Sequence, residues 1–170
     1  MSADAVAPGG DDDRVVRGHD ALEDKDFKTA KTQFDEALTS DFSNIHARLG
    51  LCQALVGLDE LKDAEKTFEA AASLEPGPGF AKAFNRLGIS LRQMKTFALS
   101  LQAFSRASDI NSGDHVIYYN MSLVHIVQFQ LDEAAGLFEK ALEIKPDFIE
   151  AKNALEKLPI WKNVLSENEK

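Results

Sequence analysis

The chain has one cysteine, Cys52, in 170 residues, so no disulfide can form within a molecule. It has no run of 18 apolar residues, and its first residues lack the basic and apolar regions of a secretory signal. Acidic residues outnumber basic residues, so the formal net charge is −9. This negative charge disfavours nucleic acid and anionic membrane as partners, because their phosphates would be repelled. These absences predict a cytoplasmic protein that neither binds nucleic acid nor inserts into a membrane.

Residue patterns that carry catalysis or bind metals are also missing. The four histidines form no i, i+4 pair with a third ligand nearby, and there is no CxxC motif. The glycine-rich stretch at residues 76–80 (PGPGF) follows a predicted helix rather than a strand, so it does not fit a phosphate-binding loop. Cys52 stands where two helices need a small residue, which favours a buried structural thiol. The sequence therefore predicts a protein that is not an enzyme and has no cofactor.

One pattern recurs along the chain: a small residue, a phenylalanine four positions later, and alanine three positions after that. Its copies are Ala30-Phe34-Ala37, Ala64-Phe68-Ala71, Ser100-Phe104-Ala107 and Ala134-Phe138-Ala141. The phenylalanines are 34, 36 and 34 residues apart. A period of about 34 residues is typical of the tetratricopeptide repeat, in which each repeat is a pair of helices.

The chain resembles tetratricopeptide-repeat (TPR) proteins over residues 11–158. Repeats three and four carry the family pattern at Phe84, Leu87, Gly88, Leu91, Phe97, Ser100, Phe104 and Ala107, and at Tyr118, Met121, Ser122, Leu131, Ala134, Phe138, Ala141 and Pro146. The resemblance implies an all-α fold, a right-handed α-solenoid of four helical hairpins plus a C-terminal capping helix. The chain departs from the pattern at Arg14 and Arg17, which replace apolar residues, and at Phe42 and Ser112, which replace a proline.

The expected boundaries follow from the repeat period and from helix-breaking residues. We expect disorder over residues 1–10, repeats at about 11–44, 45–78, 81–114 and 115–148, a capping helix at 149–158, and a tail at 159–170. The second helix of repeat one is predicted at 27–40, and Pro159 is expected to end the capping helix. The PGPGF stretch adds two residues to one repeat, either as a tolerated loop insertion or as a bend.

The resemblance implies that the first helix of each pair lines a concave groove that binds a partner. The predicted groove residues are Leu49, Gln53, Lys82, Asn85, Arg86, Ile89, Arg92, Tyr119, Asn120, Leu123 and Val127. Lys82, Arg86 and Arg92 form a basic stripe, and the neighbouring Tyr119 and Leu123 belong to an apolar stripe on a face that core packing should not need. Together they favour a peptide with carboxylates and large apolar residues. Alternatively, the cations are solvated or paired with carboxylates of neighbouring repeats.

These features predict an adaptor, co-chaperone or assembly factor with a protein or peptide partner. One alternative is a scaffold that forms homo-oligomers through its ends or its tail. In that tail Ile160, Trp161 and Leu165 would lie on one apolar face of a helix, which either packs on the capping helix or docks into another subunit. Two further alternatives are a secretion-type chaperone and a TPR module of a bacterial signalling protein.

Overall fold

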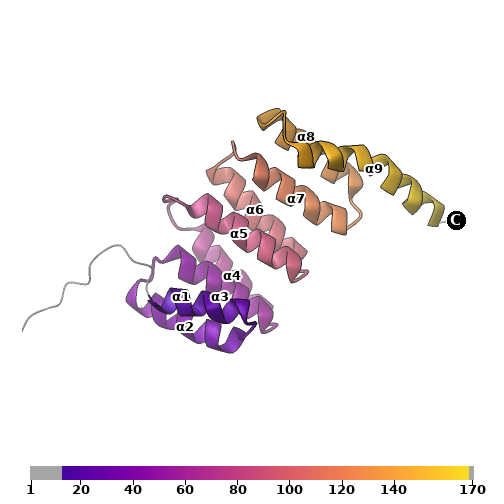
Figure 1. The fold of residues 1–170 in the computed structure, drawn as a ribbon. Coiled ribbons are helices and arrows are strands. Elements are labelled where there is room, and N and C mark those ends of the chain that lie inside the picture. Colours follow the sequence, from indigo (N-terminus) through magenta and orange to yellow (C-terminus); the bar gives the residue numbers. More distant parts are fainter. Residues whose placement is uncertain (1–12, 169–170) are drawn as a thin grey trace, which may run out of the picture. The chain divides into compact units, whose positions relative to one another are not determined.

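The computed structural model describes the backbone of residues 13–168 and the side chains of residues 13–163, so the predicted disorder at 1–10 lies outside the described residues. All regular secondary structure in this part is helical, which confirms the all-α repeat fold (Figure 1). The helices are α1 (Asp13–Glu23), α2 (Phe27–Ser40), α3 (Ile45–Gly57), α4 (Leu61–Ala72), α5 (Phe80–Gln93), α6 (Phe97–Ile110), α7 (His115–Val127), α8 (Leu131–Ile144) and α9 (Ile149–Asn168). Helix α2 has the predicted bounds.

The chain divides into two compact units between Leu74 and Glu75. The first unit contains α1–α4, and the second contains α5–α9. The boundary falls beside the PGPGF stretch, where Gly79 has a φ of 82° and precedes α5 without a side-chain cap. Proline and glycine at this point interrupt the helical repeat, and each unit has its own buried core.

In the first unit, α1 packs against α2, α3 packs against α2 and α1, and α4 packs against α3. Phe34 of α2 is fully buried between glycines of two other helices. A Cβ atom added at Gly50 of α3 would lie 2.3 Å from Phe34 Cζ, and one added at Gly18 of α1 would lie 2.6 Å from Phe34 Cε1. Because glycine has no side chain, α1 and α3 can approach α2 closely around the ring of Phe34.

The second unit repeats this arrangement. Helix α5 packs against α6, α7 against α6 and α8, and α9 against α8. Gly88 faces the ring of Phe104, and the hydroxyl of Ser100 donates to the Gly88 carbonyl over 2.7 Å. The recurring small-Phe-small pattern thus marks the buried contact inside each helical pair.

The turn inside each pair contains one residue in the left-handed backbone region. These residues are Lys25, Asp59, Lys95 and Phe129, with φ values of 59°, 62°, 62° and 59°. They are spaced like the repeat phenylalanines, so the same turn recurs four times. Left-handed backbone is unfavourable for side chains other than that of glycine, so each turn carries a local free-energy cost.

Substituting glycine at these turns is expected to stabilise the protein. Lys25→Gly and Lys95→Gly should each raise the free energy of unfolding by about 0.5–1 kcal/mol, because glycine adopts this conformation without strain. Urea unfolding followed by circular dichroism measures the change. As a matched control, Lys152→Gly in α9 should lower the free energy by about 1 kcal/mol, because glycine is a poor helix former. Destabilisation at both turns would show that the left-handed residues are not strained.

The predicted end of the capping helix at Leu158 is wrong. Helix α9 continues through Pro159 to Asn168, and Figure 1 shows it as one long helix. Proline leaves the carbonyl of Leu155 without its helical donor, which normally favours termination. An ion pair between Lys162 and Asp132 of α8 joins the segment beyond Pro159 to the preceding helix. Both side chains of this pair are largely exposed, so the ion pair contributes at most about 1 kcal/mol and does not by itself account for the continuation of α9 through Pro159.

Candidate functional site

Helix α5 has a buried face and, on the opposite side, a face that carries basic residues. Its buried residues are Ala83, Phe84, Leu87, Gly88 and Leu91. Lys82 and Arg86 lie one turn apart on the opposite side and are exposed, and Ile89 and Arg92 follow in partly buried positions. The helical period places the buried residues against α6 and leaves the cations available for contact.

The cations of α5 have no acidic partner in the described part of the chain. Among those residues, Lys82, Arg86 and Arg92 take part in no ion pair. The Arg92 Nε atom is buried without a hydrogen-bond partner. Pairing with carboxylates of neighbouring repeats, the alternative from the sequence, is therefore not observed here. We call Lys82, Arg86 and Arg92 the α5 basic stripe.

Asn120 connects α7 to α5 rather than lying open in a groove. Its Nδ2 atom donates to Asn85 Oδ1 over 3.0 Å, and its side chain is only 7% exposed. In this structure Asn120 is therefore engaged within the second unit, and its predicted contact with a partner stays a prediction. A buried amide needs hydrogen-bond partners, and this bond orients Asn85, which is partly buried beside the α5 basic stripe.

The apolar stripe on α7 is largely explained by core packing, contrary to the prediction. Tyr119 contacts the rings of Phe138 and Phe148, with centroid distances of 5.6 Å and 5.1 Å. Leu123 is partly buried and packs against the core cluster that α8 and α9 form around Phe138. Val127, at the end of α7, is 45% exposed. Packing of the capping helix thus requires most of this stripe.

The predicted groove residues of the first unit lie on α3. Leu49 is buried, so little of its surface is available to a partner in this structure, and its place in the groove stays a prediction. Gln53 is partly buried. Helix α3 has buried residues on nearly all sides, because α1, α2 and α4 pack around it. The tail residue Leu165 lies in α9, but its side chain is outside the described residues.

Comparison with known proteins agrees with the repeat pattern. Two family profiles, both described as tetratricopeptide repeat, match residues 21–83 and 115–148, which together form more than half of the chain. The chain is a tetratricopeptide-repeat protein. Proteins of this family generally serve as protein–protein interaction modules and are generally non-catalytic.

Solved structures share the fold of this TPR protein. MamA from Desulfovibrio magneticus RS-1 aligns with a TM-score of 0.56 and 20% identity, over 91% of this chain and 88% of that one. PilF of Pseudomonas aeruginosa aligns at 0.60 and 20%, over 89% and 68%. YrrB, described as a TPR protein with an unusual peptide-binding site, aligns at 0.54 and 23%, over 88% and 76%. No curated protein matches the sequence.

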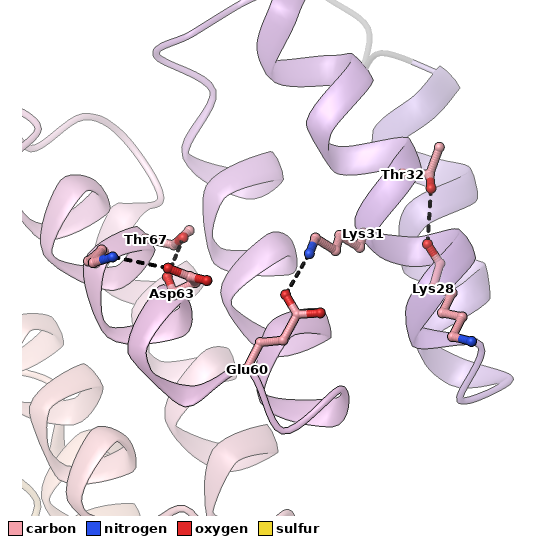
Figure 2. Close-up of polar contacts among 7 residues, drawn as sticks. Lys28, Lys31, Thr32, Glu60, Asp63 and Thr67 are labelled. Carbon is pink, nitrogen blue, oxygen red and sulfur yellow. Dashed lines mark hydrogen bonds and ion pairs between the residues drawn. The ribbon is translucent and has the colours of Figure 1, made fainter.

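A polar cluster in the first unit of the TPR protein joins two helices. Figure 2 shows Lys31 of α2 reaching Glu60, which precedes α4, and the Nζ–Oε2 distance is 2.5 Å. This hydrogen bond raises the pKa of Lys31, and burial raises the pKa of Asp35 nearby. Within residues 13–163, no group of three or more His, Cys, Asp or Glu is arranged to hold a metal ion.

The connection between α2 and α3 is held by an arginine that the sequence pattern does not mark. Arg48 is buried, and its Nε and Nη2 atoms donate to the Phe42 carbonyl over 3.1 Å and 2.6 Å. The guanidinium carbon also lies 4.2 Å from the centroid of the Phe42 ring, which is itself 76% exposed. Phe42 stands where the repeat pattern expects a proline, so Arg48 supplies the rigidity that proline would give.

Arg14 at the start of the TPR protein also bonds to a neighbouring helix. Its Nη1 atom donates to the Glu36 carbonyl over 3.0 Å, and its Nη2 atom donates to the Ser40 hydroxyl over 2.8 Å. Arg17 donates to Gln33 over 2.8 Å. Polar residues on α1 are therefore accommodated because they reach α2.

No helix in the described range has the length and apolar character needed to cross a bilayer.

Cys52 is fully buried on α3, and burial raises the pKa of its thiol from 9.0 to about 12. The unfolded chain therefore loses this proton at lower pH than the folded chain, so the contribution of Cys52 to stability is complete below pH 9 and declines above it. Relative to a Cys52→Ala variant, the TPR protein should lose about 1.4 kcal/mol between pH 8 and pH 10.

Urea unfolding of both proteins at the two pH values measures this difference, since other groups titrate equally in both. The folded thiol should also resist iodoacetamide at pH 8 and react after denaturation. Rapid alkylation of the folded protein would contradict the burial of Cys52.

Proposed function

We propose that this TPR protein is a non-catalytic interaction module, an adaptor, co-chaperone or assembly factor that binds an acidic segment of a partner polypeptide. The observation that carries the proposal is the α5 basic stripe, whose cations make no ion pair within the described residues. Unpaired cations on one helical face attract carboxylates, and an arginine fork binds a carboxylate with directional hydrogen bonds.

The charge distribution supports the second unit as the binding unit. Residues 1–74 contain 8 basic and 16 acidic residues, whereas residues 75–170 contain 11 basic and 12 acidic residues. The formal net charge is therefore −8 in the first range and −1 in the second. An acidic segment would be repelled by the first unit and tolerated by the second, where the α5 basic stripe provides a local attraction.

The neighbouring side chains restrict the partner further. Asn85 is oriented by Asn120 and retains an amide N–H₂ group that can donate to a partner carbonyl. Ile89 is partly buried on the same helix and offers a small apolar contact. The partner segment therefore combines carboxylates with few apolar side chains, since Tyr119 and Leu123 are engaged in packing.

Binding of fluorescein-labelled peptides, followed by anisotropy, tests the proposal. Peptides rich in Asp and Glu should bind more tightly than matched peptides with Asn and Gln, and added salt should weaken binding. Lys82→Glu with Arg86→Glu should weaken binding by about tenfold or more, because two favourable charge contacts become repulsive.

The matched control is Lys62→Glu with Lys66→Glu on α4, which changes the net charge by the same amount at exposed positions of the first unit. It should leave the affinity within about twofold, an energy difference below about 0.5 kcal/mol. Equal losses in both double variants would mean that net charge alone governs binding. Unchanged binding after substitution in α5 would exclude the α5 basic stripe as the site.

A further inference from the structure

The part of α9 beyond Pro159 receives little support from the rest of the second unit. The buried core cluster ends at Leu158, and the next two residues after the proline, Ile160 and Trp161, are 61% and 37% exposed. Lys162 forms the ion pair with Asp132, where the side chains are 46% and 87% exposed. A helical segment of about two to three turns is marginal in water unless an apolar face is covered. The extension therefore has the properties of a helix that packs against something further.

A third exposed apolar residue lies close to this extension. Phe129, in the turn between α7 and α8, is 70% exposed and is three residues from Asp132, the partner of Lys162. The Lys162–Asp132 ion pair therefore brings the Ile160–Trp161 step to the same end of the second unit as Phe129. We call Phe129, Ile160 and Trp161 the C-terminal apolar patch.

The turn itself does not require an aromatic residue at position 129. The three equivalent left-handed positions carry Lys25, Asp59 and Lys95, all of them charged and exposed. A phenylalanine in this conformation has the same backbone cost and in addition exposes its ring to water. Burial of the ring in an interface would offset that exposure, and rigid aromatics are typical anchors of interfaces.

We propose that the C-terminal apolar patch binds the same patch of a second copy of this chain, forming a symmetric dimer. Charge favours this partner. Residues 159–170 contain two lysines and two glutamates, and the whole second unit has a formal net charge of −1, so two copies can approach through this end without strong repulsion. The first unit, at −8, would repel its copy. A self-complementary neutral apolar patch suits an isologous interface, in which the same residues serve both protomers.

Light scattering of the full chain over a range of concentrations tests the proposal. The expected mass at high concentration is twice 18.7 kDa and decreases on dilution. Ile160→Ser with Trp161→Ser should give a monomer at all concentrations, and Phe129→Ser should weaken the dimer by about fivefold or more, the loss of one aromatic contact. Circular dichroism checks that α1–α8 remain folded in each variant.

Two control variants locate the interface at the C-terminal end. Phe42→Ser removes an equally exposed phenylalanine from the first unit and should leave the dimer intact. Lys82→Glu with Arg86→Glu should also leave it intact, since dimerisation does not depend on the α5 basic stripe. Trp161 is the single tryptophan, so its emission maximum should shift to shorter wavelength as the dimer forms.

A monomeric mass for the unmodified chain at every concentration would overturn the proposal and assign the C-terminal apolar patch to a different protein. A dimer that survives the Ile160→Ser and Trp161→Ser changes, or that Phe42→Ser dissociates, would also overturn it.

Discussion

Phe34→Ala is expected to lower the free energy of unfolding of the first unit by about 3–5 kcal/mol, the range for removing a fully buried phenylalanine. The ring of Phe34 is completely buried and fills the space that Gly18 and Gly50 leave open. Neither glycine has a side chain that could move into the cavity, so little relaxation is available. Because a domain is stable by only about 5–15 kcal/mol, this loss should bring the first unit close to unfolding at room temperature.

Urea unfolding followed by circular dichroism measures this effect, and the transition of the first unit should move to lower urea concentration. Gly50→Ala tests the same contact from the other side. Its new Cβ would lie 2.3 Å from Phe34 Cζ, and overpacking of this kind costs about 1–3 kcal/mol.

Gly136→Ala is the matched control for Gly50→Ala. Gly136 lies on α8, is exposed, and has no atom within 4 Å of its added Cβ. Here alanine should stabilise the protein by about 1 kcal/mol through helix propensity alone. Stabilisation by alanine at both glycines would contradict close packing around Phe34.

Arg48→Ala is expected to destabilise the first unit by about 2–4 kcal/mol. The substitution removes both donors to the Phe42 carbonyl, the contact with the Phe42 ring, and the packing of a buried side chain. The α2–α3 connection would then lose the bonds that fix it in place of a proline. Thermal and urea unfolding measure the loss.

Phe42→Leu separates the two interactions of Arg48. It removes the cation–π contact but keeps the carbonyl bonds, so it should cost only about 0.5–1 kcal/mol. Arg48→Lys cannot bond through two donors in a fixed fork and should resemble Arg48→Ala more than the unmodified chain. A cost for Phe42→Leu as large as that for Arg48→Ala would show that the ring, rather than the carbonyl, is the main partner.

The repeat architecture could be predicted from sequence because its determinants are local and periodic. The Phe34 pattern recurs every 34 to 36 residues, and each copy specifies the same contact between two adjacent helices. The predicted helix end at Leu158 failed because α9 continues through Pro159, and the residue that Lys162 contacts there, Asp132, is distant in sequence. No pattern within α9 contains that information.

The candidate site could be predicted only in part. The α5 basic stripe follows from the helical period and stands out against the acidic composition. The exposure of Lys82 and Arg86 could therefore be predicted from the sequence. The Asn85–Asn120 bond joins residues 35 positions apart, and Tyr119 packs on Phe148 of the following segment. Such contacts depend on how adjacent helical pairs stack, which the pattern of one helix does not specify. The bonds from Arg48 to Phe42 span only six residues, but the repeat pattern does not mark these two residues as partners.

The most direct test of the central claim is to map the binding site by NMR, using backbone amide shifts of the full chain during titration with an acidic peptide. The proposed function predicts that the largest shifts fall on α5 around Lys82, Arg86 and Arg92, with smaller ones on α7 near Asn120, and that the shifts diminish as salt is added. Shifts concentrated on α1–α4, or none at saturating peptide, would contradict the assignment of the α5 basic stripe as the partner-binding surface.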